Sequence, residues 1–88
     1  MRRTIINLKK VESTADLYNI IETKLRTPEY FGRNLDALHD ILTDMSGTVE
    51  FRSFGKAKAA LGEYGDSLEE MLRAASAESE RIEIILKY

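Results

Sequence analysis

Three short apolar segments lie far apart in the 88-residue chain, and the stretches between them show helical periodicity. The segments are residues 4–8, 48–51 and 82–86, and each is rich in the β-branched and aromatic residues typical of strands. Strands that are separated by helices favour a parallel sheet with crossover connections. The sequence therefore predicts an α/β fold in which a three-stranded parallel sheet is covered by about four helices, in the order β-αα-β-αα-β.

The two later segments differ in how deeply we expect them to be buried. Residues 48–51, with the sequence Thr-Val-Glu-Phe, alternate between polar and apolar, which predicts a half-polar strand. Residues 82–86, with the sequence Ile-Glu-Ile-Ile-Leu, are almost continuously apolar. A strand of that kind is typically buried on both faces of a parallel sheet.

The first helix is predicted from about residue 14 to residue 25. Its apolar stripe has helical spacing and consists of Leu17, Ile20, Ile21 and Leu25. Ser13 or Thr14 offers an N-cap, and Pro28 prevents the helix from continuing. Residues 28–32 then form a turn in which Gly32 is expected to accept a positive φ.

Three further helices follow from the same periodicity. Asn34 is the predicted N-cap of the second helix, which ends at Ser46-Gly47. Its inward-facing residues are Leu35, Leu38, Leu42 and Met45. Ser53 is expected to cap a short third helix with an apolar face made of Ala57, Ala60, Leu61 and Tyr64. Gly65-Asp66-Ser67 predicts a restart into a fourth helix, whose inward-facing residues are Leu68, Met71, Leu72 and Ala75.

The composition is that of an ordinary globular domain. The chain is 43% hydrophobic and 32% charged, and 88 residues leave room for one core, so we expect a single domain over residues 1–88. The absence of cysteine fits a reducing compartment, and we expect a cytoplasmic protein. We expect neither an export signal nor a membrane span, because no apolar run is long enough. The net charge of −2 identifies no partner by itself.

The sequence offers little that could carry catalysis. It has no P-loop, no G-x-G-x-x-G, no H-E-x-x-H and no nucleophile elbow. His39 is the single histidine, and Asp36 and Asp40 lack the further ligands that a dedicated metal site needs. We therefore expect no catalytic residues, no metal and no cofactor. The scattered basic residues predict no direct nucleic-acid binding: Arg2, Arg3, Lys9, Lys10, Lys24 and Arg26.

One polar stripe on the second helix is more informative. Asp36, His39, Asp40 and Thr43 recur at helical spacing opposite the leucines. Like charges four residues apart destabilise a helix, and aspartate is a poor helix former. Asp36 gains from the helix dipole at the N-terminus, whereas Asp40 gains much less. The stripe is either a solvated face, which the pattern alone favours, or a binding face. Tyr30 and Phe31, just before it, are either core residues or exposed anchors.

A longer block changes the balance between these interpretations. Residues 28–40 read Pro-Glu-Tyr-Phe-Gly-Arg-Asn-Leu-Asp-Ala-Leu-His-Asp, and this block resembles the barstar family of ribonuclease inhibitors. The order of the surrounding elements, from Ile5-Ile6-Asn7 to residues 82–86, is similar too, so the resemblance covers essentially the whole chain. A block of this length is far more specific than a short motif, and it favours the binding face.

The resemblance implies a stoichiometric inhibitor of barnase-like, guanyl-specific microbial ribonucleases. In that family the helix and the loop before it occlude the active site of the nuclease. Asp40 is then expected in the phosphate-binding centre of the enzyme, and Asp36 and Tyr30 in the same cleft. Asn34, Gly32 and Thr43 are expected beside them. The implied partner is a secreted ribonuclease or nuclease toxin with a basic active site, and the free inhibitor is expected to be monomeric.

The chain departs from the family pattern at three places. His39 stands where the family often has tryptophan, and Ala74 stands where the namesake of the family has an interface glutamate. Glu78, one turn later, is a candidate acid at the rim. The segment of residues 44–48 is shorter than the corresponding segment in the namesake of the family. It lacks a proline and an interface tryptophan that the namesake has there, while Asp44 adds charge. The candidate partner-binding residues are thus Tyr30, Phe31, Gly32, Asn34, Asp36, His39, Asp40, Thr43, Asp44 and Glu78.

Two other functions stay open at this point. The same face could serve an immunity protein for a nuclease toxin outside the guanyl-specific group. The chain could also be an interaction domain that binds another protein and inhibits nothing.

Overall fold

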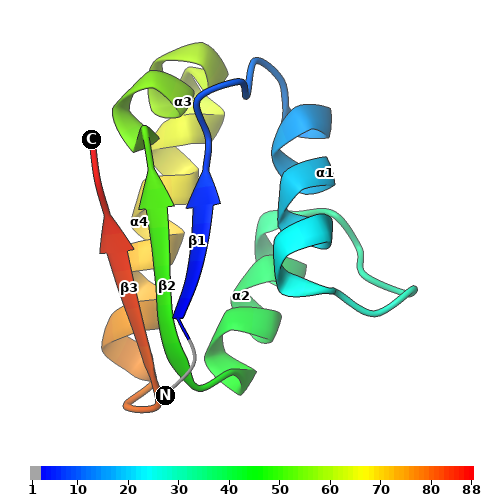
Figure 1. The fold of residues 1–88 in the computed structure, drawn as a ribbon, viewed down its shortest axis with the longest axis vertical. Helices are drawn as coiled ribbons and strands as arrows, with labels where there is room; N and C mark the ends of the chain where they lie inside the picture. Colours follow the sequence, from blue (N-terminus) through cyan, green and yellow to red (C-terminus); the bar gives the residue numbers. More distant parts are fainter. Residues whose placement is uncertain (1–2) are drawn as a thin grey trace.

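The computed structural model of the protein describes residues 3–88, in which a three-stranded parallel sheet is combined with four helices. The elements follow in the order β1 (Arg3–Asn7), α1 (Thr14–Leu25), α2 (Leu35–Asp44), β2 (Gly47–Arg52), α3 (Phe54–Leu61), α4 (Glu63–Glu78) and β3 (Ile82–Leu86) (Figure 1). The predicted fold class and the predicted order of elements are confirmed. Arg2, one of the scattered basic residues, lies outside the described part of the chain.

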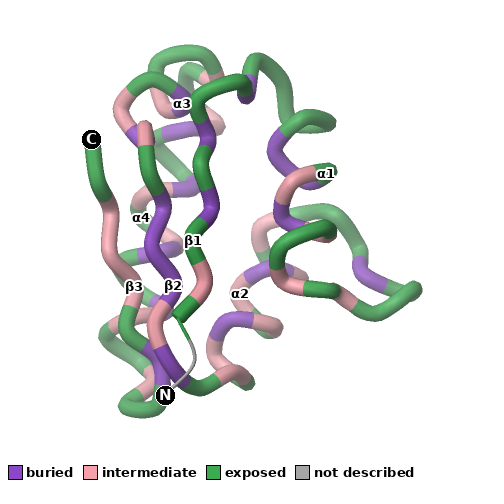
Figure 2. The backbone as a smooth tube through the Cα atoms, viewed as in Figure 1, coloured by how far each residue is buried: buried purple, intermediate pink, exposed green. Residues whose placement is uncertain are grey.

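The sheet has the strand order β1-β2-β3, with β2 in the middle. Both pairs are parallel, and Ile6, Phe51 and Leu86 occupy one row across the sheet. Residues in one row point to the same face. Figure 1 shows α4 behind the sheet and α1 on the side of β1. The burial map in Figure 2 shows that β2 carries the longest buried stretch of the three strands.

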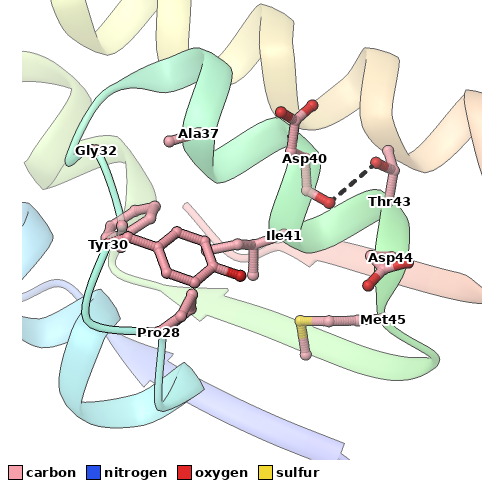
Figure 3. Close-up of a pocket in the computed structure, with 10 residues that line it drawn as sticks. Pro28, Tyr30, Gly32, Ala37, Asp40, Ile41, Thr43, Asp44 and Met45 are labelled. Carbon is pink, nitrogen blue, oxygen red and sulfur yellow. Dashed lines mark hydrogen bonds between the residues drawn. The ribbon is translucent and has the colours of Figure 1, made fainter.

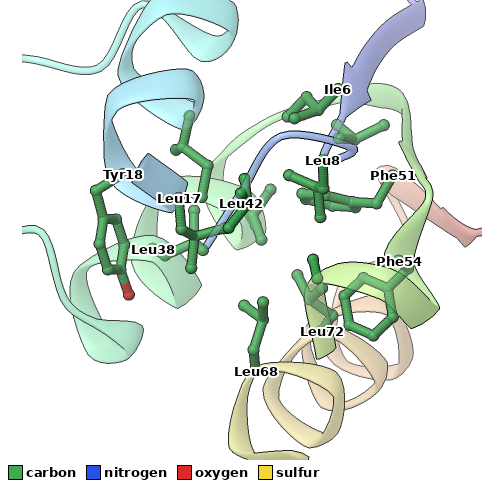
Figure 4. Packing of buried hydrophobic residues seen from close by; sticks show 14 of the residues in the cluster. Ile6, Leu8, Leu17, Tyr18, Leu38, Leu42, Phe51, Phe54, Leu68 and Leu72 are labelled. Atoms are coloured by element: carbon green, nitrogen blue, oxygen red, sulfur yellow. The ribbon is translucent and has the colours of Figure 1, made fainter. Parts of the chain in front are cut away.

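The core lies on one face of the sheet, where all four helices contribute side chains. Ile6 and Phe51 project from the strands and are fully buried (Figure 4). Facing them are Leu17 and Leu42 from α1 and α2, Phe54 from α3, and Leu68 and Leu72 from α4. This arrangement fixes α2 against the core through its leucines and leaves its opposite side to solvent.

The opposite face of the sheet overturns one prediction about the strands and contains a buried charge that the sequence did not reveal. β3 is an edge strand in which only Ile82 is buried, so the predicted burial on both faces is wrong. Conversely, Glu50 of β2 is 2% exposed, although its segment was predicted to be half polar. Arg3 and Arg52 form ion pairs with its carboxylate, and these bonds, chiefly the one from Arg52, hold the pKa of Glu50 below its usual range. Strand order, which the sequence does not reveal, decides both outcomes.

The boundary between α3 and α4 also differs from the prediction. The chain turns at Gly62, with φ of 61° and ψ of −130°, and not at Gly65-Asp66-Ser67. Gly65 is buried inside α4, where a Cβ atom would lie 2.4 Å from the carbonyl oxygen of Lys58. The glycine thus permits close packing of two helices rather than a break. Ser53 occupies the predicted N-cap position of α3 but makes no capping hydrogen bond with its side chain, and Ala60, predicted on the apolar face, is exposed.

Candidate protein-binding site

The first turn of α2 is fixed by Asn34, as predicted. Its side-chain oxygen accepts a hydrogen bond from the backbone nitrogen of Ala37 at 2.8 Å, and its Nδ2 donates to the carbonyl oxygen of Gly32 at 3.2 Å. Gly32 does not have the expected positive φ, which falls instead on Arg33 at 52°. A Cβ at Gly32 would lie 3.0 Å from the side-chain amide nitrogen of Asn34. Glycine at this position therefore leaves room for the capping side chain.

Three aspartates lie along the exposed side of α2 at intervals of four residues. We call Asp36, Asp40 and Asp44 the acidic ridge; all three are exposed. Within residues 3–88, neither Asp36 nor Asp44 forms an ion pair, and Asp40 has only a 3.6 Å contact with Nδ1 of His39. Asp44 occupies the last turn, where the helix dipole disfavours a negative charge. The ridge therefore adds little to the stability of the helix that carries it.

His39 connects α2 to α4. Its Nε2 is hydrogen-bonded to Glu78 of α4, while its Nδ1 faces Asp40. The bond to Glu78, supported by Asp40, raises the pKa of His39 above its usual value of 6.5. Glu78, the candidate acid at the rim, is thus engaged with the imidazole. The pair brings a fourth acid close to the acidic ridge and makes the local charge depend on pH.

The two adjacent aromatic residues before α2 have opposite surroundings. Tyr30 is 88% exposed, whereas Phe31 is 8% exposed and packs on the Tyr18 ring at a centroid distance of 5.9 Å. Tyr18 is itself held by a 2.5 Å hydrogen bond between its hydroxyl and that of Tyr64. Tyr30 is therefore available to a partner, and Phe31 supports the loop from beneath.

Tyr30 and the acidic ridge border one open hollow of about 780 Å³. Figure 3 shows Tyr30 extending from the loop across the hollow, with Asp40, Asp44 and Met45 contributed by α2 and its C-terminal end. The lining residues are Pro28, Tyr30, Phe31, Gly32, Ala37, Asp40, Ile41, Thr43, Asp44 and Met45. The hollow combines an apolar surface with carboxylates at its edge, a combination suited to a cationic side chain.

The structure brings together six of the ten predicted residues around this hollow. Asn34 caps the helix instead, and Asp36, His39 and Glu78 lie outside the lining. Four lining residues were missed: Pro28, Ala37, Ile41 and Met45. For Ile41 a signal existed, since it is an apolar residue beside the leucine stripe, whereas Met45 was predicted to face inward and lines the hollow instead.

The hydroxyl of Thr43 is occupied within its own helix. It donates to the backbone oxygens of His39 and Asp40, at 2.9 and 3.3 Å respectively. The carbonyl oxygen of Thr43 accepts a hydrogen bond from Arg81 at 3.2 Å. Since α2 has no basic residue in its last turn, Arg81 supplies the positive charge that the C-terminal end of the helix favours.

No cluster of three or more histidine, cysteine or acidic side chains within residues 3–88 is arranged to hold a metal ion. Within the same range, the helices are too short or too polar to traverse a lipid bilayer.

The fold and this site describe a small α/β protein whose second helix presents carboxylates and a neighbouring tyrosine to solvent. The sequence profile of the family described as "Barstar (barnase inhibitor)" matches residues 1–88. A protein of Bacillus subtilis (strain 168), named "Putative ribonuclease inhibitor YrdF", is 37% identical over 81 residues, which covers 89% of each chain. The chain therefore belongs to the barstar family.

Proposed function

We propose that the protein is a stoichiometric inhibitor of a barnase-type, guanyl-specific microbial ribonuclease, and that it works by occluding the active site. The observation that carries this proposal is the acidic ridge, whose carboxylates are exposed and have almost no partners among the described residues, beside a hollow bordered by Tyr30. Membership of the barstar family supports it, as does the inhibitor name of the Bacillus subtilis relative.

Electrostatic complementarity explains why such a face fits a ribonuclease. An enzyme that cleaves RNA must bind a phosphodiester, and it does so with arginine, lysine and histidine side chains. A carboxylate held on a rigid helix can occupy the place of that phosphate. Asp40 lies midway along the acidic ridge and beside the hollow, so we assign it to the phosphate-binding centre of the enzyme.

The other residues of the face have supporting roles in this proposal. Asp36 and Tyr30 contact the same cleft, and the exposed ring of Tyr30 is a typical interface anchor. Basic side chains of the ribonuclease enter the hollow between Tyr30 and Asp44. The protein supplies no catalytic group, and inhibition follows from excluding RNA.

The proposal also implies where the inhibitor acts and how fast it binds its partner. A secreted ribonuclease endangers the cell only before export, so we assign the inhibitor to the cytoplasm, as a monomer that pairs with one enzyme molecule. Opposite charges on the two surfaces accelerate their encounter. Association is therefore expected to slow as salt rises, because ions screen exposed charges over about 10 Å at 0.1 M.

A titration tests the proposal directly. RNA cleavage by a fixed concentration of a barnase-type ribonuclease is measured while the purified protein is added. We expect activity to fall linearly and to vanish near one equivalent. Suppression of the toxicity of the ribonuclease in cells that express both proteins is the second readout.

Two results would redirect or refute the proposal. Inhibition of a nuclease toxin outside the guanyl-specific group, with no effect on barnase-type enzymes, would keep the binding face and replace the partner. Failure against a panel of microbial ribonucleases, in the titration and in cells, would refute inhibition and leave an interaction domain.

A further inference from the structure

The loop between α1 and α2, residues 26–34, contains no helix or strand of its own, yet it carries Tyr30 and Gly32 to the hollow. Loops of this kind usually sample many conformations. Binding by such a loop is weakened by the entropy lost when it becomes ordered, unless the free protein already holds the bound conformation. What fixes the loop in the free protein therefore bears on affinity.

Within the described residues, every hydrogen bond from a side chain of this loop to α1 is made by Arg33. Its Nη1 donates to Glu22 Oε1 at 2.5 Å. Its Nη2 donates to Asn19 Oδ1 at 3.1 Å and to the carbonyl oxygen of Ala15 at 3.3 Å. The guanidinium also lies 6.0 Å from the centre of the Tyr18 ring. One side chain thus contacts three successive turns of α1.

The backbone of the loop is arranged around these contacts. Arg33 has φ of 52°, a left-handed conformation that side chains other than glycine and asparagine adopt at some cost. Phe31, two residues earlier, is buried against Tyr18. Phe31 and Arg33 are therefore fastened to the core and to α1, while Tyr30 and Gly32, on either side of Phe31, line the hollow.

We propose that Arg33 is a positioning residue for partner binding, which holds the α1–α2 loop in its presented conformation by clamping it to α1. This inference rests on the proposed function for its consequence on affinity. Its consequence for the loop of the free protein does not depend on any partner.

Arg26 provides a matched control within the same loop. It is also an exposed arginine with φ of 52°, but its side chain makes no hydrogen bond or ion pair among the described residues. Replacing either residue by alanine removes the same charge from the same backbone conformation. Removal of a positive charge alone favours association with a basic enzyme, so a loss of affinity opposes the charge effect.

The first measurement uses the free protein. Amide hydrogen exchange of Phe31, whose nitrogen donates to the carbonyl oxygen of Pro28 at 3.0 Å, is compared in the wild type, Arg33→Ala and Arg26→Ala under conditions where the protein stays folded. We expect exchange at least about tenfold faster in Arg33→Ala and nearly unchanged in Arg26→Ala. Glu22→Gln, which weakens one of the contacts, is expected to lie between them. Equal exchange in the two arginine variants would overturn the inference, whether or not any ribonuclease is bound.

The second measurement uses a catalytically inactive barnase-type ribonuclease. We expect Arg33→Ala to bind about tenfold more weakly and Arg26→Ala to bind within about twofold of the wild type. Arg33→Lys is expected to recover only part of the affinity, because an ammonium cannot reproduce the planar fork of the guanidinium.

A double-mutant cycle with Tyr30→Ala separates positioning from direct contact. If Arg33 acts by presenting Tyr30, then Arg33→Ala raises the Kd for the ribonuclease by less than about threefold when Tyr30 is already alanine. A full loss in that background would contradict positioning. If the wild type binds no ribonuclease, the proposed function fails on its own, and the exchange measurement still decides whether Arg33 holds the loop.

Discussion

Replacement of Asp40 by alanine should separate binding from folding more clearly than any other single change. The side chain is 85% exposed, and its one ion pair within residues 3–88 is the 3.6 Å contact with His39. Loss of an exposed pair costs about 0.2–1 kcal/mol. Alanine gains up to about 0.7 kcal/mol of helix propensity over aspartate and removes repulsion from the other acids of the ridge. The free energy of unfolding should therefore change by less than about 1 kcal/mol.

Affinity for the ribonuclease should respond differently. A charged residue at the centre of an interface typically costs about 2 kcal/mol or more when truncated, which corresponds to at least about a 30-fold rise in Kd. Urea unfolding followed by circular dichroism gives the stability, and titration of RNA cleavage gives the Kd. Asp66→Ala is the matched control, because Asp66 is also an exposed helical aspartate, with a 3.7 Å contact to Lys58. Its Kd should stay within about twofold of the wild type.

Two outcomes would refute this reasoning. If Asp40→Ala lowered stability and affinity by the same free energy, the residue would act through the fold. If Asp40→Ala and Asp66→Ala had the same small effect on Kd, the acidic ridge would not be the centre of the interface.

Two further predictions concern the helices that support the face. Gly65→Ala should destabilise the protein, since a propensity gain of about 1 kcal/mol is outweighed by a Cβ placed 2.4 Å from the Lys58 carbonyl oxygen; urea unfolding should show this loss, and higher stability would contradict it. The raised pKa of His39 means that its bond to Glu78 contributes stability below pH 6.5, which is lost as pH rises through the folded-state pKa. In an NMR titration, Glu78→Gln should lower the pKa of His39 while Glu70→Gln leaves it unchanged; equal titration in both variants would exclude the pairing.

The fold could be predicted from local patterns because its elements are individually well marked. Ser13 and Asn34 cap α1 and α2 as expected, and α1 has the predicted bounds. Each helix coincides with a stretch whose apolar residues recur at helical spacing, so the order of helices and strands along the chain could be assigned from the sequence. Asp40 could also be singled out, because an aspartate far from the helix N-terminus fits its local structure poorly.

Contacts between distant residues could not be read in the same way. The sequence showed a glycine near a helix boundary, but only packing shows that Gly65 allows α3 and α4 to approach. Arg33 looked like one more residue of the loop, yet its guanidinium reaches residues 11 to 18 positions earlier in the chain. Neither contact produces a periodic pattern in the sequence, and neither depends on the residues next to it in the chain.

The sequence by itself determined the element types, their order and the polar side of α2, since these depend on capping, periodicity and propensity within a few residues. Tertiary structure alone decided that β2 is central, that Glu50 is buried between two arginines, and that Tyr30 is exposed while Phe31 is not. These outcomes depend on which surfaces meet across the core, and burial is a property of the packed chain rather than of any segment.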